Sequence, residues 1–186
     1  PRQPGLSLHL TRRWAYLMGS VVQDVPRELK QFARLFDELS YRHSSYGEVF
    51  SDWLDYAVAC FLTTGDPETA QHLEKRYGKD YPLFDKIFRE WVAVQNAMIV
   101  GDGDWYDTLG IFYEVVASRY KSSWLGQFFT PTNVVDMMCL MHGAGPEQAG
   151  KKLRILDPCS GSGRMLIAWH AKAPGNYQFG ADVDPV

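Results

Sequence analysis

The sequence predicts a mainly α chain with an α/β part, in which an N-terminal helical bundle is followed by a strand–helix–strand unit. Two observations predict this fold class. Helix start signals and apolar residues at helical spacing recur up to about residue 120, and a strand, a glycine-rich turn, a helix and a second strand follow after residue 150. We therefore expect an N-terminal extension over 1–22, a helical domain over 23–125 and an incomplete α/β domain over 126–186.

Five helices are predicted in the helical domain, each from its start signal. Pro26 stands where a first helical turn tolerates proline, Ser45 opens a Ser-x-x-Glu capping box, and Asp66 precedes a first-turn proline. Pro82 opens a longer helix, and Asp107 opens a short one. The residues predicted to be buried at helical spacing are Leu29, Phe32, Phe36, Leu39, Val49, Trp53, Tyr56, Cys60, Phe84, Ile87, Trp91, Val94 and Met98.

The α/β part begins with a further helix that ends near Gly143. A short β-like run over 153–157 leads into a glycine-rich turn, and a helix over about 164–172 follows. Residues 177–182 form a second strand that ends in an acid. This order predicts the opening βαβ unit of a nucleotide-binding α/β sheet.

Charge and cysteine content exclude several classes of function. The 19 Lys and Arg residues against 22 Asp and Glu residues give a net charge of −3, which excludes a uniformly basic nucleic-acid-binding surface. The three cysteines include no CxxC pair and the five histidines lack metal-ligand spacing, so we predict no metal site and no disulfide framework. No apolar run approaches the ~18–20 residues of a membrane span. We therefore expect a soluble, cytoplasmic protein.

The turn at Cys159-Ser-Gly-Ser-Gly163 differs from the common phosphate-binding loops. A dinucleotide fingerprint would place a third glycine where Leu166 stands, and a P-loop would place lysine where Arg164 stands. Asp157 ahead of the glycines would repel a pyrophosphate but attract an ammonium or sulfonium group. The alternative is a plain glycine-rich turn between strand and helix.

Asp182 at the end of the second strand is the candidate for binding ribose. A carboxylate offers two acceptors to two adjacent hydroxyl donors, and nucleotide-binding βαβ units place an acid at this point. Asp184 is a competing candidate two residues later, and an acid in a surface loop is the alternative to both.

Three segments together resemble the S-adenosylmethionine-binding half of N6-adenine DNA methyltransferases. They are Gly126-Gln-Phe-Phe-Thr-Pro131, Asp157-Pro-Cys-Ser-Gly-Ser-Gly163 and Phe179-Gly-Ala-Asp-Val-Asp-Pro185. The resemblance extends in particular to modification subunits of type I restriction-modification systems and related N-6 DNA methylases. It implies a Rossmann-like methyltransferase domain that transfers a methyl group from S-adenosylmethionine to adenine N6 in DNA.

The same resemblance implies a role for each site residue. Thr130 contacts the methionine end of the cofactor, with Phe128 and Phe129 lining the site. Asp157 faces the amino-acid part of the cofactor, and Asp182 binds its ribose. The remaining residues implied to lie near the cofactor are Cys159, Gly161 and Gly163, through their backbone, and Val183, against the adenine.

The chain departs from the family at the catalytic motif. That motif, [DNS]-P-P-[YFW], holds the flipped adenine, and the 186 residues contain no Pro-Pro pair. We therefore assign no catalytic residue and expect the chain alone to be inactive. In the intact enzyme the resemblance implies DNA as substrate and a specificity or restriction subunit as partner.

Two competing functions and one structural expectation remain open. The chain is alternatively a non-catalytic helical module that binds DNA or a subunit, with a vestigial methyltransferase start, or a nucleotide-dependent oxidoreductase, which the missing third glycine disfavours. Two strands and one helix cannot bury both faces of a sheet. We therefore expect the strand faces near Ile155 and Phe179 to be covered by a second copy or by the helical domain, or to be poorly ordered.

Overall fold

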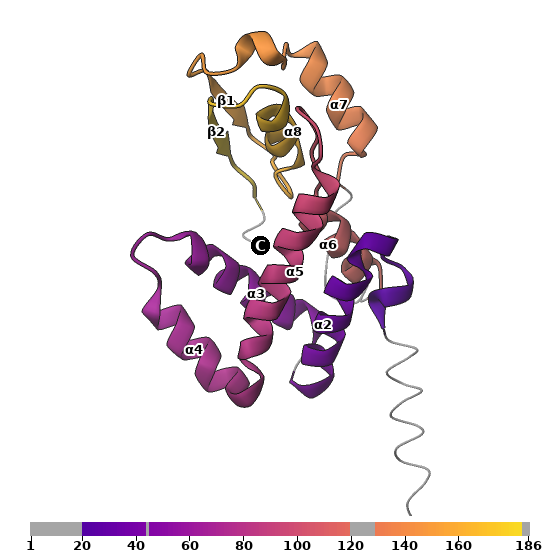
Figure 1. The fold of residues 1–186 in the computed structure, drawn as a ribbon, viewed down its shortest axis with the longest axis vertical. Coiled ribbons are helices and arrows are strands. Elements are labelled where there is room, and N and C mark those ends of the chain that lie inside the picture. The colour runs from indigo at the N-terminus through magenta and orange to yellow at the C-terminus, as the bar shows by residue number, and fades with distance from the viewer. Residues whose placement is uncertain (1–19, 44, 120–128, 184–186) are drawn as a thin grey trace, which may run out of the picture. The chain divides into compact units, whose positions relative to one another are not determined.

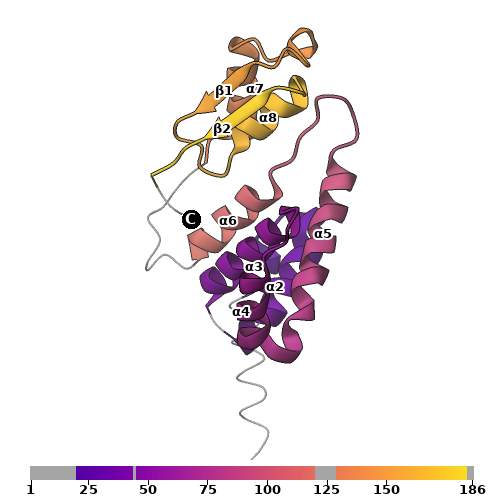
Figure 2. The same cartoon turned by 90° about the vertical axis from the view of Figure 1, so that its left-hand side faces the viewer.

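The computed structural model describes residues 20–43, 45–119 and 129–183. The chain divides into two compact units, Pro1–Glu90 and Trp91–Val186 (Figures 1 and 2). The structure is mostly helical with a small two-stranded sheet, which agrees with a mainly α chain carrying an α/β part. Most of the N-terminal extension, Phe128 and Asp184 lie outside the described residues.

The N-terminal unit is helical in all its described regular elements, and its helices begin where the sequence signals predict. The Ser45 side chain accepts a hydrogen bond from the Glu48 backbone N at 3.4 Å, and Asp66 Oδ1 accepts one from Thr69 N at 3.1 Å. The elements are η1 Val21–Gln23, η2 Arg27–Leu29, α2 Lys30–Arg42, α3 Tyr46–Phe61, α4 Pro67–Tyr77, η3 Gly78–Asp80 and α5 Pro82–Met98, whose second half belongs to the C-terminal unit.

An aromatic core holds this unit together. Phe32, Phe36 and Trp53 are fully buried, and the Trp53 ring lies 5.6 Å from the Phe32 ring and 5.5 Å from the Phe36 ring between centroids. The predicted stripe is wrong at Cys60, which is exposed, while Tyr56 is half-buried. The reason is that the last turn of α3 lies largely in solvent.

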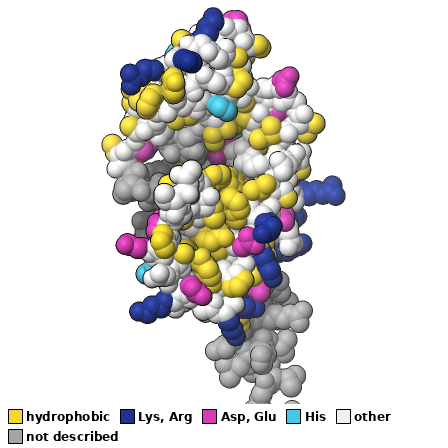
Figure 3. All heavy atoms as spheres, turned by 60° about the vertical axis from the view of Figure 1, so that its left-hand side comes forward, with side chains coloured by type: hydrophobic (Ala, Val, Ile, Leu, Met, Phe, Trp, Pro, Cys, Tyr) yellow, Lys and Arg dark blue, Asp and Glu magenta, His cyan; other side chains and the backbone are white. Residues whose placement is uncertain are grey.

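The exposed end of α3 adds hydrophobic side chains to the surface of the N-terminal unit. Val58, Phe61 and Leu62 are 62%, 68% and 48% exposed, and hydrophobic side chains gather on the face of this unit that Figure 3 shows. No helix in the described part of the chain combines the length and the apolar character needed to cross a membrane.

The C-terminal unit contains the predicted strand–helix–strand order. The two strands pair in parallel, with Arg154 opposite Tyr177 and Asp157 opposite Gly180. The carboxyl ends of both strands therefore meet at one edge of the sheet, beside the start of the helix between them. The elements that lie wholly in this unit are α6 Thr108–Arg119, α7 Thr132–Met141, η4 Pro146–Gln148, β1 Arg154–Asp157, α8 Arg164–Lys172 and β2 Tyr177–Gly180.

The two faces of this sheet differ. Helices α7 and α8 lie on one side of it (Figure 2), where Ile155 packs against a buried cluster built around Val135 and Trp169. The expectation that a second copy or the helical domain covers the strand face near Ile155, or that it is poorly ordered, is therefore wrong, because α7 and α8 cover that face. On the other side Leu156 and Phe179 are 66% and 43% exposed.

Asp136 makes the stability of the C-terminal unit sensitive to acid. Burial raises its pKa, but hydrogen bonds from Lys172 Nζ at 2.6 Å and Trp105 Nε1 at 2.9 Å outweigh burial and hold the pKa below its ordinary value. The stabilisation is thus present above the unfolded pKa of about 3.9 and is lost as the pH falls through the folded pKa. We expect Asp136→Asn to reduce the loss of unfolding free energy between about pH 5 and pH 3, measured by urea titration. An unchanged pH dependence, matching that of Asp102→Asn at an exposed acid, would contradict this.

Candidate functional site

A pocket of about 250 Å³ lies where the carboxyl ends of β1 and β2 meet. It brings together six of the residues predicted for the site, and these are Phe129, Thr130, Asp157, Cys159, Gly161 and Asp182. Gly163 does not line the pocket but begins α8 just beyond it. Val183 is fully exposed and does not line the pocket, while Phe128 lies outside the described residues.

The glycine turn wraps one wall of the pocket. Asp157 ends β1, and its Oδ1 accepts a hydrogen bond from Cys159 N at 3.1 Å. Gly161 and Gly163 have φ angles of +50° and +76°, a left-handed conformation that glycine adopts without steric cost. Gly161 also lies against an aromatic ring, because a Cβ there would stand 3.0 Å from two carbon atoms of Phe129.

Asp182 closes the opposite side of the turn. Its Oδ2 accepts a hydrogen bond from Gly161 N at 2.7 Å. Two backbone hydrogen bonds of 2.9 Å join the same segments, from Ser160 N to Ala181 O and from Ala181 N to Asp157 O. The two acids singled out in the sequence thus stand at the ends of neighbouring strands, held around the glycine turn.

The Phe129-Thr130 segment forms the other wall. The Phe129 backbone N donates a hydrogen bond to Glu114 Oε1 at 3.2 Å, and the Thr130 carbonyl accepts one from Arg164 Nη1 at 2.7 Å. The Phe129 ring lies 5.4 Å from the Tyr113 ring and 5.4 Å from Arg164 Cζ. Contacts from two different helices therefore fix this segment.

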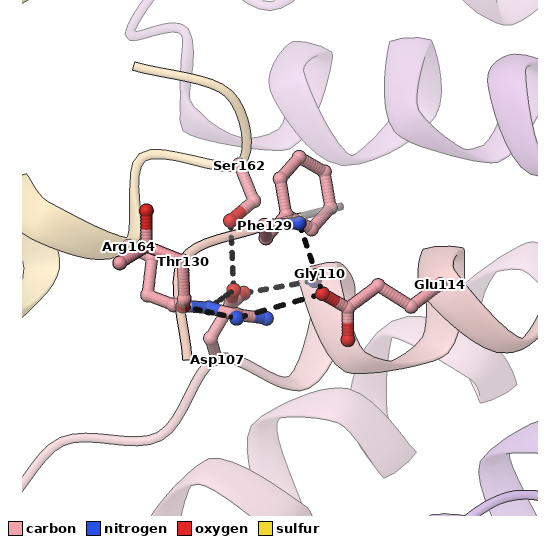
Figure 4. Close-up of polar contacts among 7 residues, drawn as sticks. All are labelled: Asp107, Gly110, Glu114, Phe129, Thr130, Ser162 and Arg164. Carbon is pink, nitrogen blue, oxygen red and sulfur yellow. Dashed lines mark hydrogen bonds and ion pairs between the residues drawn. The ribbon is translucent and has the colours of Figure 1, made fainter. Parts of the chain in front are cut away.

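Asp107 and Arg164, which lines the pocket, form a buried ion pair (Figure 4). Their side chains are 2% and 6% exposed, and Asp107 Oδ2 lies 2.8 Å from Arg164 Nε. The same oxygen accepts a hydrogen bond from Ser162 Oγ at 2.8 Å, and Oδ1 accepts one from Gly110 N, also at 2.8 Å. Asp107 thus caps α6 and holds the glycine turn at once.

Sequence reasoning missed this ion pair. Asp107 was predicted only as a helix start, and Arg164 only as a departure from a P-loop. The available signal was the seven-residue spacing of Asp107 and Glu114, which places two acids on one side of a short apolar helix. That spacing does not identify Arg164 as the partner, because Arg164 lies 57 residues after Asp107.

The charges around the pocket favour a cationic ligand. Asp157 and Asp182 line it, and the lining cation, Arg164, is already paired with Asp107. A phosphate group would meet two carboxylates here, whereas an ammonium or sulfonium group would be attracted. Within residues 20–43, 45–119 and 129–183, no group of three or more His, Cys, Asp and Glu side chains is placed to hold a metal ion.

Comparison with protein families finds a match for the segment that supplies most of this pocket. Residues 104–178, about two-fifths of the chain, match the family model described as N-6 DNA Methylase. No curated protein and no solved structure matches the chain. The match runs from just before α6 into β2, and both it and the C-terminal compact unit begin earlier than the α/β domain predicted from residue 126. This match over residues 104–178 supports the N-6 DNA methylase assignment that the sequence motifs predicted.

Proposed function

We propose that the C-terminal unit binds S-adenosylmethionine and is the cofactor-binding start of a Rossmann-like domain that methylates adenine N6 in DNA. The observation that carries this proposal is the pair of carboxylates, Asp157 and Asp182, around the glycine turn, while Arg164, which also lines the pocket, is paired with Asp107. The cofactor carries a sulfonium and an ammonium group against one carboxylate. Its net positive charge matches this pocket, and the charge of a nicotinamide dinucleotide does not.

The proposed contacts are those that the family resemblance implies, for residues that line the pocket. Thr130 would contact the methionine end, Asp157 the ammonium group, and Asp182 the ribose hydroxyls. Cys159, Gly161 and Gly163 would bring backbone near the cofactor. Ligand pockets commonly enclose about 300–1,000 Å³, so the pocket of about 250 Å³ suits part of the cofactor.

The proposed activity of these 186 residues is binding, not methyl transfer. The family holds the flipped adenine with its Pro-Pro motif, and the sequence contains no such pair. DNA as substrate and a specificity or restriction subunit as partner belong to the proposed function of the intact enzyme. Self-association through the face of the sheet that exposes Leu156 and Phe179 is also part of the proposal.

Calorimetric titration of the chain with S-adenosylmethionine tests this function. We expect binding by the parent chain and a loss of affinity of about ten- to a hundredfold for Asp182→Ala, because a charged acceptor is removed from the ribose hydroxyls. Asp102→Ala, at an exposed acid that does not line the pocket, is the matched control and should bind like the parent.

Three results would reject the proposal. They are no binding of S-adenosylmethionine to the folded chain, equal affinity for Asp182→Ala, and tighter binding of a nicotinamide dinucleotide. A folded chain that binds duplex DNA but no cofactor would instead support the helical binding module.

A further inference from the structure

We infer that helix α6 is a clamp that positions the two walls of the pocket. The clamp consists of Asp107, which caps α6, Glu114 on α6, and Arg164, the first residue of α8 (Figure 4). The identity of the ligand depends on the proposed function, but the geometry of the clamp does not. Neither Asp107 nor Glu114 lines the pocket, so both are positioning residues rather than ligand contacts.

The carboxylates of Asp107 and Glu114 each hold a different wall of the pocket. Asp107 stands immediately before α6 and caps it, and Glu114 lies about two helical turns further along the chain. Asp107 Oδ2 reaches the glycine turn through Ser162 Oγ, at 2.8 Å. Glu114 Oε1 reaches the other wall through the backbone N of Phe129, at 3.2 Å. One helix thus sets the spacing between the two segments that would enclose the cofactor.

Arg164 contacts both carboxylates of the clamp. Its Nε lies 2.8 Å from Asp107 Oδ2 and its Nη1 lies 3.6 Å from Glu114 Oε1, while Nη1 also donates to the Thr130 carbonyl at 2.7 Å. The guanidinium carbon stands 5.4 Å from the Phe129 ring centroid. A planar group with donors on several edges can make these contacts at once, whereas the single ammonium group of lysine cannot.

The buried charges are better explained by position than by stability. Removing a carboxylate and a guanidinium from water costs nearly as much as their attraction returns, so such a pair adds little to stability over an apolar pair. What this pair supplies is a fixed direction for the Thr130 carbonyl and for the Phe129 ring. The ring in turn contacts Gly161, where there is no room for a side chain.

Two substitutions of Glu114 separate positioning from stability. The side chain is 35% exposed, so both variants should fold. Glu114→Gln keeps an oxygen that accepts from Phe129 N, and Glu114→Leu does not. We expect Glu114→Leu to speed amide hydrogen exchange at Phe129 about tenfold and to weaken S-adenosylmethionine binding by about three- to tenfold. Glu114→Gln should leave both close to the parent values.

Asp136→Asn is the control for an ion pair of the same unit that lies away from the pocket. Asp136 pairs with Lys172 at 2.6 Å and lines no part of the pocket. Its loss should lower the melting temperature without changing cofactor affinity. Arg164→Lys, which keeps the charge but not the fork of donors, should lower affinity more than Asp136→Asn at a similar melting temperature.

The outcomes distinguish this inference from the proposed function. Unchanged exchange at Phe129 in Glu114→Leu would overturn the clamp, whether or not the cofactor binds. If the parent chain binds S-adenosylmethionine and Glu114→Leu binds it equally well, the clamp is also overturned and the proposed function stands. If the parent chain does not bind, but Phe129 exchange rises in the leucine variant alone, the clamp stands and the proposed function fails.

Discussion

Replacing Gly110 by alanine should destabilise the C-terminal unit by about 2–4 kcal/mol, although alanine is the better helix former. In an open helix the change would stabilise by about 1 kcal/mol. Here a Cβ would stand 2.0 Å from Asp107 Oδ2 and 2.8 Å from Ser162 Oγ. The Asp107 carboxylate would have to move, and breaking a buried ion pair typically costs about 3–5 kcal/mol.

Urea unfolding followed by hydrogen exchange and mass spectrometry would measure this effect, since peptides report each unit separately. Ser118→Ala, at an exposed position of the same helix, is the control and should change stability by less than about 0.5 kcal/mol. In an Asp107→Ala background, Gly110→Ala should add little further loss, because the colliding carboxylate is gone. A Gly110→Ala variant as stable as the parent would contradict the packing around Asp107.

Trp53→Ala should destabilise the N-terminal unit by about 3–5 kcal/mol. The side chain is fully buried between the Phe32 and Phe36 rings, and its Nε1 donates to the Phe84 carbonyl at 3.3 Å. Alanine would leave a cavity that fixed aromatic neighbours cannot fill, and would leave the carbonyl without this donor.

The same urea titration would detect this loss in peptides of the N-terminal unit. Val58→Ala removes an apolar side chain from the same helix at a position that is 62% exposed, and its effect should stay within about 0.5 kcal/mol. Equal stabilities of the two variants would mean that the aromatic core does not hold the unit together.

Local signals predicted most of the helices and both strands. Ser45 and Asp66 cap helices where the sequence places them, and α8 spans the predicted residues, because capping and helical spacing act over a few neighbouring residues. The prediction that Cys60 is buried was wrong because burial depends on residues that are distant in the sequence. Apolar residues continue at helical spacing to the end of α3, but the sequence does not show how far along α3 the neighbouring helices pack against it.

The sequence predicted the residues that line the candidate site but not the contacts that hold those residues in place. Thr130, Asp157 and Asp182 were named from motifs, and the fold brings them to one pocket. The contacts that hold these parts together join Asp107 to Arg164 across 57 residues. Such a pairing depends on how whole elements pack, and no local pattern in a single sequence encodes it.

The distance along the chain between Asp107 and Arg164 has a consequence during synthesis. The carboxylate leaves the ribosome 57 residues before its guanidinium partner. Until then, packing the start of α6 would dehydrate an unpaired charge, which is unfavourable. The contacts of the Trp53 ring with the Phe32 and Phe36 rings lie within residues 32–53, so they can form before Arg164 has been synthesised.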